Sequence, residues 1–267
     1  MPDPALTALH GAPSPDERAA IGVLGGVGPY AGLDLVRGIF DETDADSDQT
    51  HLPVALISYP NRIPDRATWL RDPTTPSPVP GMMTVLRRLD DAGCAVAGIP
   101  CNTAHVPAIF DRLREGLLAD GRELELVHIV DAIVARLAEV APDATTVGVL
   151  ATSSSIQNRL HEIGLEAAGL HAVVPDAAHQ AEVEGAIYDD WGLKAQSQPP
   201  TDRARQALLD ATDHLIGQGA QAVILGCTEL PLAVPEPDRG GVPFVNSTRA
   251  LSRALIRASH PEKLRRP

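Results

Sequence analysis

Two cysteines stand in similar surroundings and are the first candidates for chemistry. Cys101 lies in IPCNTA and Cys227 lies in LGCTEL, so each follows an apolar run and precedes short polar residues. Such a pattern is typical of a helix start, where backbone N–H groups and the helix dipole stabilise a thiolate. A thiolate can remove a proton from carbon, and a thiol on the opposite face can return one. Two facing cysteines would therefore invert a stereocentre.

The third cysteine and the cysteine count set limits on other thiol chemistry. Cys94 continues into an apolar run in DAGCAVAG, and we expect it in the core as a small hydrophobic residue. Three cysteines in 267 residues do not make a disulfide framework, so we expect free thiols in a reducing, cytoplasmic compartment. The sequence has no C-x-x-C motif, and two isolated cysteines without a clear pair of histidines predict no zinc site or other metal site.

The elements that must position these cysteines follow from alternating patterns. Helical periods such as MMTVLRRLDDAG and RARQALLDATDHLIGQG separate short apolar runs that are typical of buried strands. These runs are 21–26, 54–59, 95–100, 125–130, 146–151, 171–175, 222–226 and 242–246. Strands and helices that alternate at this spacing predict mostly parallel sheets covered by helices on both faces.

An internal repeat relates the two halves of the chain. VGVL begins 126 residues after IGVL, and Cys227 lies 126 residues after Cys101. One offset aligns both landmarks, which predicts two pseudo-symmetric three-layer α/β halves, 20–130 and 131–260, with the last helix able to pack on the first half. Ligands of parallel sheets bind beyond the carboxyl ends of the strands. We therefore expect the active site in the cleft between the halves.

Composition and charge exclude several classes of partner. The formal net charge of -13 disfavours nucleic acid and anionic membrane surfaces, and no apolar stretch approaches the roughly 18 residues of a membrane span. Residues 1–19 contain four prolines and no hydrophobic period, which predicts a disordered leader, and 261–267 read as a frayed tail.

The segment GVGPYA raises the alternative of a dinucleotide site. It fits G-x-G-x-x-A after a strand, but Pro29 interrupts it and DETDADSD reads as a polar loop where an acidic residue should end a second strand. We favour glycines that make room for a small substrate, with the Gly26 N–H available to a carboxylate.

Five motifs in order resemble the aspartate/glutamate racemase family over most of residues 20–260. GVLGGVGPYAGLDL is similar to the family's GxxGGMGPxAT, PNRIPDRATWL to IPDRT, and VEGAIYDDWGLK to RGIYexxK, while CNTAH and GCTE match the two cysteine motifs. The resemblance implies a homodimeric racemase that needs no cofactor, with Cys101 and Cys227 as the two bases. Glu229 after Thr228 favours the aspartate branch.

The resemblance also implies roles for other residues. Asn102, Thr103 and Thr228 would lie near the α-carboxylate and amino group of a small dicarboxylic amino acid. Arg66 and Lys194 would bind or shield its side-chain carboxylate, although most Arg and Lys are surface charges. Thr152, Ser153 and Ser154 replace the ATxGT loop and would hold a carboxylate or cap a helix. His105 and Glu229 are candidate assisting groups, and a helical histidine more often packs on its own turn.

Several departures and rival functions stay open. Val27, Gly32 and Asn246 replace the Met, Thr and Asp of the family pattern, which leaves the choice between aspartate and glutamate unsettled. A maleate-type cis/trans isomerase, or a racemase or epimerase of another small carboxylic acid, would use the same two thiols. A third alternative is a non-catalytic protein that binds acidic amino acids, although such a protein would be expected to lose one of the bases.

Overall fold

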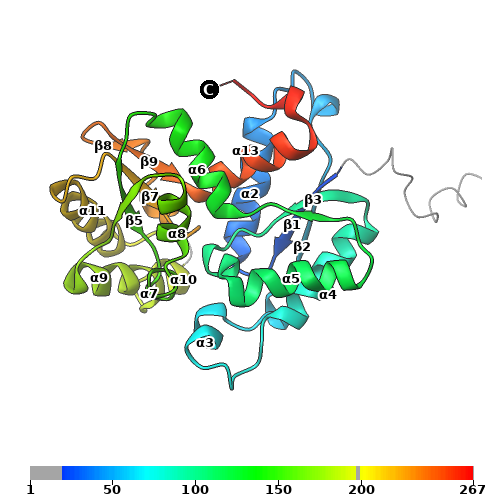
Figure 1. The fold of residues 1–267 in the computed structure, drawn as a ribbon, viewed down its shortest axis with the longest axis horizontal. Coiled ribbons are helices and arrows are strands. Elements are labelled where there is room, and N and C mark those ends of the chain that lie inside the picture. Colours follow the sequence, from blue (N-terminus) through cyan, green and yellow to red (C-terminus); the bar gives the residue numbers. More distant parts are fainter. Residues whose placement is uncertain (1–19, 197–198, 267) are drawn as a thin grey trace, which may run out of the picture.

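Two mostly parallel β-sheets, one in each half of the chain, form the frame of the protein (Figure 1). The computed structural model describes residues 20–196 and 199–266, so the predicted disordered leader at 1–19 lies outside the described residues. Within the described residues, no helix is both long enough and apolar enough to cross a membrane.

The first sheet has four parallel strands in the order β2-β1-β3-β4. The strands are β1 (Ala20–Gly25), β2 (Val54–Ser58), β3 (Cys94–Gly98) and β4 (Glu125–Leu126). The helices are α2 (Pro29–Glu42), α3 (Arg66–Arg71), α4 (Val79–Asp91) and α5 (Pro107–Ala119), with short 3₁₀ turns η3 (Asp48–Thr50), η4 (Pro60–Arg62) and η5 (Asn102–His105).

The second sheet has five strands in the order β6-β5-β7-β9-β8, and only its edge strand β8 is antiparallel. The strands are β5 (Thr146–Leu150), β6 (His171–Val173), β7 (Ala222–Leu225), β8 (Asp238–Arg239) and β9 (Val242–Asn246). The helices are α6 (Ile129–Val140), α7 (Ser153–Gln157), α8 (Leu160–Ala167), α9 (Ala177–Tyr188), α10 (Leu193–Gln196), α11 (Asp202–Gly217), α12 (Leu230–Ala233) and α13 (Ser247–Ser259), followed by the 3₁₀ turn η6 (Pro261–Lys263).

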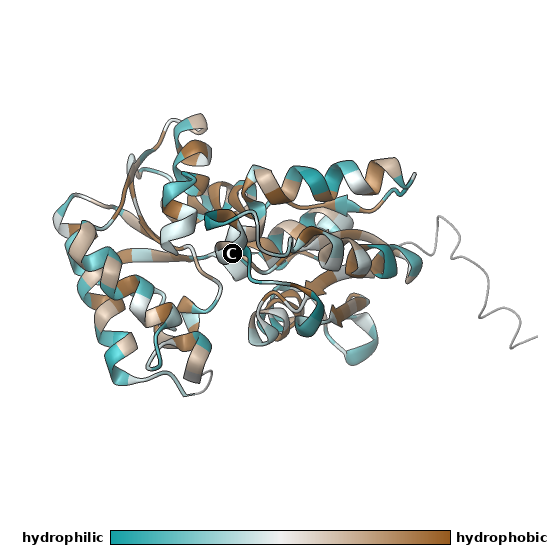
Figure 2. Ribbon diagram, turned by 90° about the horizontal axis from the view of Figure 1, so that it is seen from below, coloured by the Kyte–Doolittle hydropathy of each residue, from teal (hydrophilic) through white to brown (hydrophobic). Residues whose placement is uncertain are grey.

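Both faces of each sheet are buried, which gives each half three layers. In β1, Ile21 and Val23 face α2 and α13, whereas Leu24 belongs to the cluster formed with α4 and α5. In the second half the same division places α6 and α8 on one face and α9 and α11 on the other. The strands are accordingly apolar along their length, and the helices alternate between apolar and polar residues (Figure 2). The predicted α/β architecture is confirmed.

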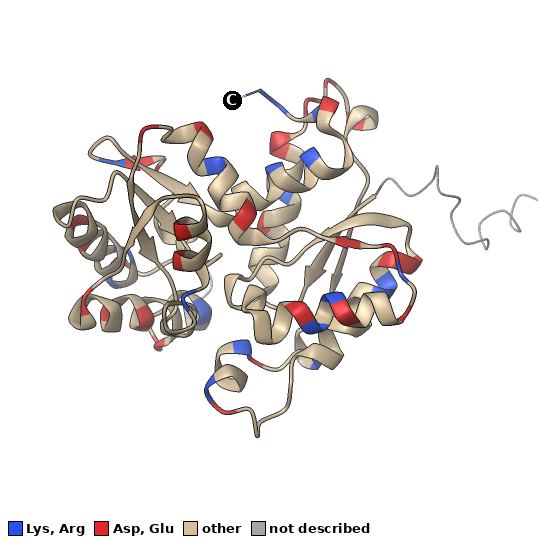
Figure 3. Ribbon diagram, viewed as in Figure 1, with Lys and Arg blue, Asp and Glu red and all other residues tan. Residues whose placement is uncertain are grey.

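The last helix, α13, joins the halves by packing on α2, β1 and β3 of the first sheet and on α6. Gly38 permits this approach, since a Cβ there would lie 2.4 Å from the Ser252 hydroxyl. Buried Glu42 at the end of α2 forms ion pairs with Arg249 and Arg253 of α13. Acidic and basic residues meet where these two helices lie side by side (Figure 3).

Two sequence expectations are wrong at element ends. The strand expected at 125–130 stops at Leu126 and α6 begins at Ile129, because one short apolar run spans the end of a strand and the start of a buried helix. The tail is not frayed over 261–266. The Asp44 N–H donates to the Lys263 carbonyl (2.7 Å) and the Arg265 N–H donates to the Glu42 carbonyl (2.8 Å), so the tail pairs with the chain that follows α2.

Candidate active site

The two cysteines leave their sheets at equivalent places. Cys101 follows β3 and precedes η5, and Cys227 follows β7 and precedes α12. Both side chains are buried, with exposed fractions of 8% and 6%. The Thr228 hydroxyl, next to Cys227, donates to the carbonyl of Pro100, next to Cys101, at 3.1 Å. The two cysteine loops therefore meet at the contact between the halves.

Predicted polar residues make a second contact between the halves. The Thr103 hydroxyl lies 3.3 Å from the hydroxyls of Thr152 and Ser155, which belong to the loop and helix after β5. The Asn102 amide donates to the Ser247 hydroxyl at the start of α13 (3.1 Å). Thr152 also caps α7 by accepting from the Ser155 N–H (3.2 Å). Thr152 thus makes the helix cap that was one of its two expected roles, and it lies at the junction between the halves.

The other two residues of this loop point in different directions. The Ser153 N–H donates to Glu184 of α9 (2.7 Å), and its hydroxyl accepts from the Gln180 amide (3.2 Å). Ser154 is 2% exposed, and its hydroxyl has no hydrogen-bond partner among the described residues. Ser153 is therefore fixed by hydrogen bonds to α9, whereas the buried Ser154 hydroxyl is available to a ligand.

A cavity of about 270 Å³ opens between the two halves. Its walls come from the loop after β1, the segment 60–66, and the helices α10 and α12. The lining residues are Gly26, Val27, Gly28, Pro29, Tyr30, Pro60, Ile63, Asp65, Arg66, Leu193, Lys194, Glu229 and Leu232. Four predicted site residues are therefore in the wall, and neither cysteine is. Each thiol instead interacts with a lining residue, Cys101 with Arg66 and Cys227 with Glu229.

Cys227 is held as a thiol by its surroundings. Its Sγ–H donates to the Glu229 carboxylate at 3.0 Å. Burial, and then the negative charge of Glu229, raise the pKa of Cys227 well above its usual value, although Lys194 acts in the opposite direction. This sulfur is suited to hold a proton and to donate it.

Arg66 places a positive charge beside the other cysteine. Its Nη2 donates to the Val27 carbonyl, and its Nε has no partner among the described residues although the side chain is 6% exposed. Burial opposes the charge, but the Cys101 sulfur and then Asp65 raise the pKa of Arg66. The guanidinium can stabilise a Cys101 thiolate and still offer a donor to a ligand.

Lys194 is a second cation, half-buried, and its charge interacts with both sulfurs. Its Nζ donates to the Tyr188 hydroxyl (3.3 Å) and lies 4.4 Å from the centre of that ring. Burial opposes its charge, but Glu229 and then Cys227 raise its pKa, with a smaller contribution from Cys101. Tyr188, whose own pKa burial raises, was missed as a site residue by the sequence analysis. Its signal was its place in the quoted AIYDDWGLK segment.

His105 is placed as a packing residue beside the site. Its ring is fully buried, stacks on Phe110 at 4.9 Å, and has its Nδ1 3.0 Å from the Cys101 carbonyl. Burial and His128 lower its pKa to about 3, so the ring is neutral near pH 7. His161, which sequence reasoning also missed, has its Nε2 3.0 Å from the side-chain oxygen Oδ1 of Asn102 and orients that side-chain amide.

The glycine turn after β1 fits closely against the cavity. Gly26 has a φ of +85°, and a Cβ there would lie 2.8 Å from the Tyr59 backbone. A Cβ on Gly28 would lie 2.6 Å from the Glu229 carboxylate. Of the three departures from the family pattern, Val27 lines the cavity, whereas Gly32 is not in its lining and Asn246 caps α13 through the Arg249 N–H (3.0 Å).

Two α/β halves with a small charged cavity between them form a pocket suited to a small charged molecule. Residues 24–255 match the Asp/Glu/Hydantoin racemase family, and the chain belongs to this family of isomerases. The resemblance seen in the sequence motifs is thereby confirmed.

Individual relatives are distant but cover nearly the whole chain. The broad specificity amino-acid racemase RacX of Bacillus subtilis (strain 168) is 23% identical over 240 residues, or 88% of this chain and 96% of RacX. The Picrophilus torridus aspartate racemase structure has a TM-score of 0.73 at 24% identity, covering 90% of this chain and 94% of its own. The glutamate racemase of Francisella tularensis subsp. tularensis SCHU S4, in complex with D-glutamate, has a TM-score of 0.61 at 18% identity, covering 94% and 84%.

Proposed function

We propose that the protein racemises an acidic amino acid without a cofactor, with aspartate as the first candidate and glutamate as the second. Cys101 and Cys227 would exchange protons with the α-carbon from opposite faces. The observation that carries this proposal is the hydrogen bond from Thr228 to Pro100, because it joins the two cysteine loops directly. Lys194, whose charge interacts with both sulfurs, supports the same arrangement.

The proton balance of the reaction follows from the two environments. A Cys101 thiolate beside Arg66 takes the α-proton, and the electron pair of the C–H bond stays on carbon as a carbanion. The Cys227 thiol then donates its proton to the other face, which leaves a Cys101 thiol and a Cys227 thiolate. The opposite enantiomer is converted from that second protonation state. Arg66 and Lys194 would stabilise the carboxylates as negative charge develops beside them.

The charges of the cavity wall match a dicarboxylic amino acid. Arg66 and Lys194 provide two cations for two carboxylates, and Asp65 and Glu229 provide acceptors for an ammonium group. Burial acts against the Asp65 charge, but the Thr68 N–H and Arg66 lower its pKa, so this group is an anion near pH 7. Val27, Ile63 and Leu232 add apolar surface to the same wall.

Glu229 would assist by positioning the Cys227 proton. Its carboxylate accepts from the thiol and lies next to the Thr228 hydroxyl (3.3 Å). This contact keeps Cys227 protonated while Cys101 acts as base. The cytoplasmic location and the homodimer remain predictions from the sequence.

Exchange of the α-hydrogen with solvent deuterium tests the function. The purified, reduced protein should exchange the α-hydrogen of L- and D-aspartate without added pyridoxal phosphate and in the presence of a chelator. Cys101→Ala and Cys227→Ala should each abolish racemisation, whereas Cys94→Ala, which changes a core thiol away from the cavity, should retain it.

Parallel assays separate the rival functions. Conversion of maleate to fumarate without amino-acid exchange would identify the cis/trans isomerase alternative. Calorimetric binding of aspartate without exchange by the intact protein would identify a binding protein. Either result, or turnover that survives the loss of one active-site cysteine, contradicts the proposed mechanism.

A further inference from the structure

A cluster of two histidines and one aspartate lies on the second half, outside the cavity described above. Asp176 precedes α9, His179 is in the first turn of α9, and His214 is in the last turn of α11. One donor atom from each lies within 4.8 Å of the others, and the described residues contain no second group of this kind. None of the three lines the active-site cavity.

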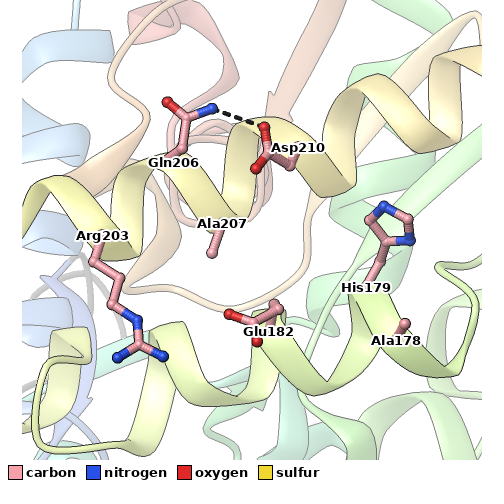
Figure 4. Close-up of a pocket in the computed structure, with 7 residues that line it drawn as sticks. All are labelled: Ala178, His179, Glu182, Arg203, Gln206, Ala207 and Asp210. Atoms are coloured by element: carbon pink, nitrogen blue, oxygen red, sulfur yellow. Dashed lines mark hydrogen bonds between the residues drawn. The ribbon is translucent and has the colours of Figure 1, made fainter.

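The packing of α9 on α11 builds the cluster. The two imidazole rings stack with their centres 4.1 Å apart and an angle of 16° between their planes. His179 rises from α9 toward α11, at one end of the groove between these helices (Figure 4). The sequence predicted no metal site because it contains no compact motif, and this cluster joins residues that are 35 positions apart in the chain.

The distances between the donor atoms are close to those around a small cation. His179 Nδ1 lies 2.8 Å from Asp176 Oδ1, and His214 Nε2 lies 3.7 Å from Asp176 Oδ2. Adjacent ligands of a tetrahedral zinc ion with bonds near 2.0 Å are about 3.3 Å apart. The observed distances lie on either side of this value, although they involve different oxygens of Asp176. The two stacked rings would have to turn so that nitrogens now within 4.8 Å of each other meet at one ion.

Hydrogen bonds now engage the donor atoms, and an ion would replace some of them. His179 Nδ1 donates to Asp176 Oδ1 (2.8 Å), so an ion at this nitrogen would displace its proton. His214 Nε2 accepts from the Asp176 N–H at 3.4 Å, so its lone pair faces the cluster. The Gln218 amide also lies 2.6 Å from this nitrogen and would have to turn aside. Asp176 Oδ1 caps α9 by accepting from the His179 N–H (2.9 Å), which leaves Oδ2 for a second partner. Capping and metal binding can therefore coexist in one carboxylate.

We propose that Asp176, His179 and His214 form a binding site for a borderline divalent cation of the zinc type. Two imidazoles and a carboxylate suit such an ion, and partial exposure leaves room for water as a fourth ligand. The site does not contribute to proton transfer. It ties the start of α9 to the end of α11, and α9 also carries Gln180 and Glu184, which hold Ser153 beside the active site.

Zinc titration of the full chain tests this site. Isothermal calorimetry would use a Cys101→Ser/Cys227→Ser parent, so that zinc bound by the active-site thiols does not contribute. The parent should bind about one zinc ion, and His179→Ala and His214→Ala should each weaken this binding about tenfold or more. His171→Ala, which removes an exposed histidine of the same half, is the matched control and should bind like the parent.

A second measurement keeps the result independent of folding defects. Urea unfolding without zinc shows whether each variant is folded, and saturating zinc should stabilise the parent but not His214→Ala. The proposal is overturned if the parent binds no zinc, or if both histidine variants bind it as tightly as the parent. Neither outcome bears on the racemase function, which is assayed with a chelator.

Discussion

Replacing Arg66 with alanine should separate acidic from neutral substrates. The guanidinium is 6% exposed, lines the cavity, and has an Nε without a partner among the described residues. A substrate carboxylate would accept a hydrogen bond from this Nε in a buried setting, where a hydrogen bond to a charged group contributes about 1.5–3 kcal/mol. At about 1.4 kcal/mol for each factor of ten, kcat/KM for aspartate should fall by about 10- to 150-fold.

The same change should lower kcat/KM for alanine less, because alanine has no side-chain carboxylate and loses only the effect of Arg66 on the Cys101 sulfur. Exchange of the α-hydrogen, followed by NMR in deuterated buffer, gives kcat/KM for both substrates under one set of conditions. Arg66→Lys keeps the charge without the planar fork and should restore only part of the loss. Arg62→Ala is the control, since Arg62 is an exposed cation that stacks over Tyr59 and is absent from the cavity wall.

An equal loss for aspartate and alanine would refute this reasoning. It would mean that Arg66 acts on the reaction of every substrate, through the Cys101 sulfur beside it, and does not read the side chain. An unchanged kcat/KM for aspartate would remove Arg66 from the site altogether.

Three further changes test the electrostatics and the packing. Glu229→Gln removes the negative charge beside Cys227, so the raised pKa of Cys227 should fall. In the reaction direction that uses Cys227 as the acid, the alkaline limb of the pH–rate profile should then move to lower pH. Glu229→Asp keeps the charge and should show a smaller move, and profiles identical to that of the unmodified protein would contradict the contact. His105 has a pKa of about 3 in the folded chain and about 6.5 in the unfolded chain, so below pH 6.5 the unfolded chain binds more protons. The free energy of unfolding should therefore fall as the pH drops toward 3, by up to about 1.4 kcal/mol per pH unit. Urea titrations should show a shallower slope over this range in His105→Gln, and an unchanged slope would mean that this ring is charged in the fold. Glu42→Ala should lower the free energy of unfolding by about 1.5–3 kcal/mol, because buried Arg253 loses a charged hydrogen-bond partner but keeps its ion pair with Glu139. Asp41→Ala, at an exposed ion pair, should change it by less than about 1 kcal/mol.

Much of the fold could be predicted because the strands are buried on both faces. A strand such as β1 reads as a continuous apolar run, and the common offset of the two cysteine motifs marked the repeat. The boundary near Leu126 could not be predicted, since an apolar run of a few residues fits a buried strand or the start of a buried helix. The ordered tail was missed because its partners, at the end of α2, are more than 200 residues away in sequence.

The site was predictable as motifs but not as contacts. Motif residues identified Arg66, Lys194 and Glu229, which the structure places in the cavity wall. The sequence could not assign a neighbour to each thiol, because that depends on how loops from separate halves meet. For the same reason Tyr188 and His161 were missed, although each makes a specific polar contact with a predicted residue.

The internal repeat gives the two cysteines equivalent backbones, but their polar neighbours differ. Cys101 has the Arg66 cation, whereas Cys227 has the Glu229 anion, with Lys194 near both. A perfectly symmetric site would treat the two thiols alike, whereas here Glu229 and burial raise the pKa of Cys227 and a cation lies beside Cys101. A racemase must still reach the opposite protonation state in each full cycle, and Lys194 lessens the cost because it can support a thiolate on either side. In the proposed mechanism the repeat would provide the two-sided geometry, and the Cys227–Glu229 contact would make Cys227 the proton donor in the first step.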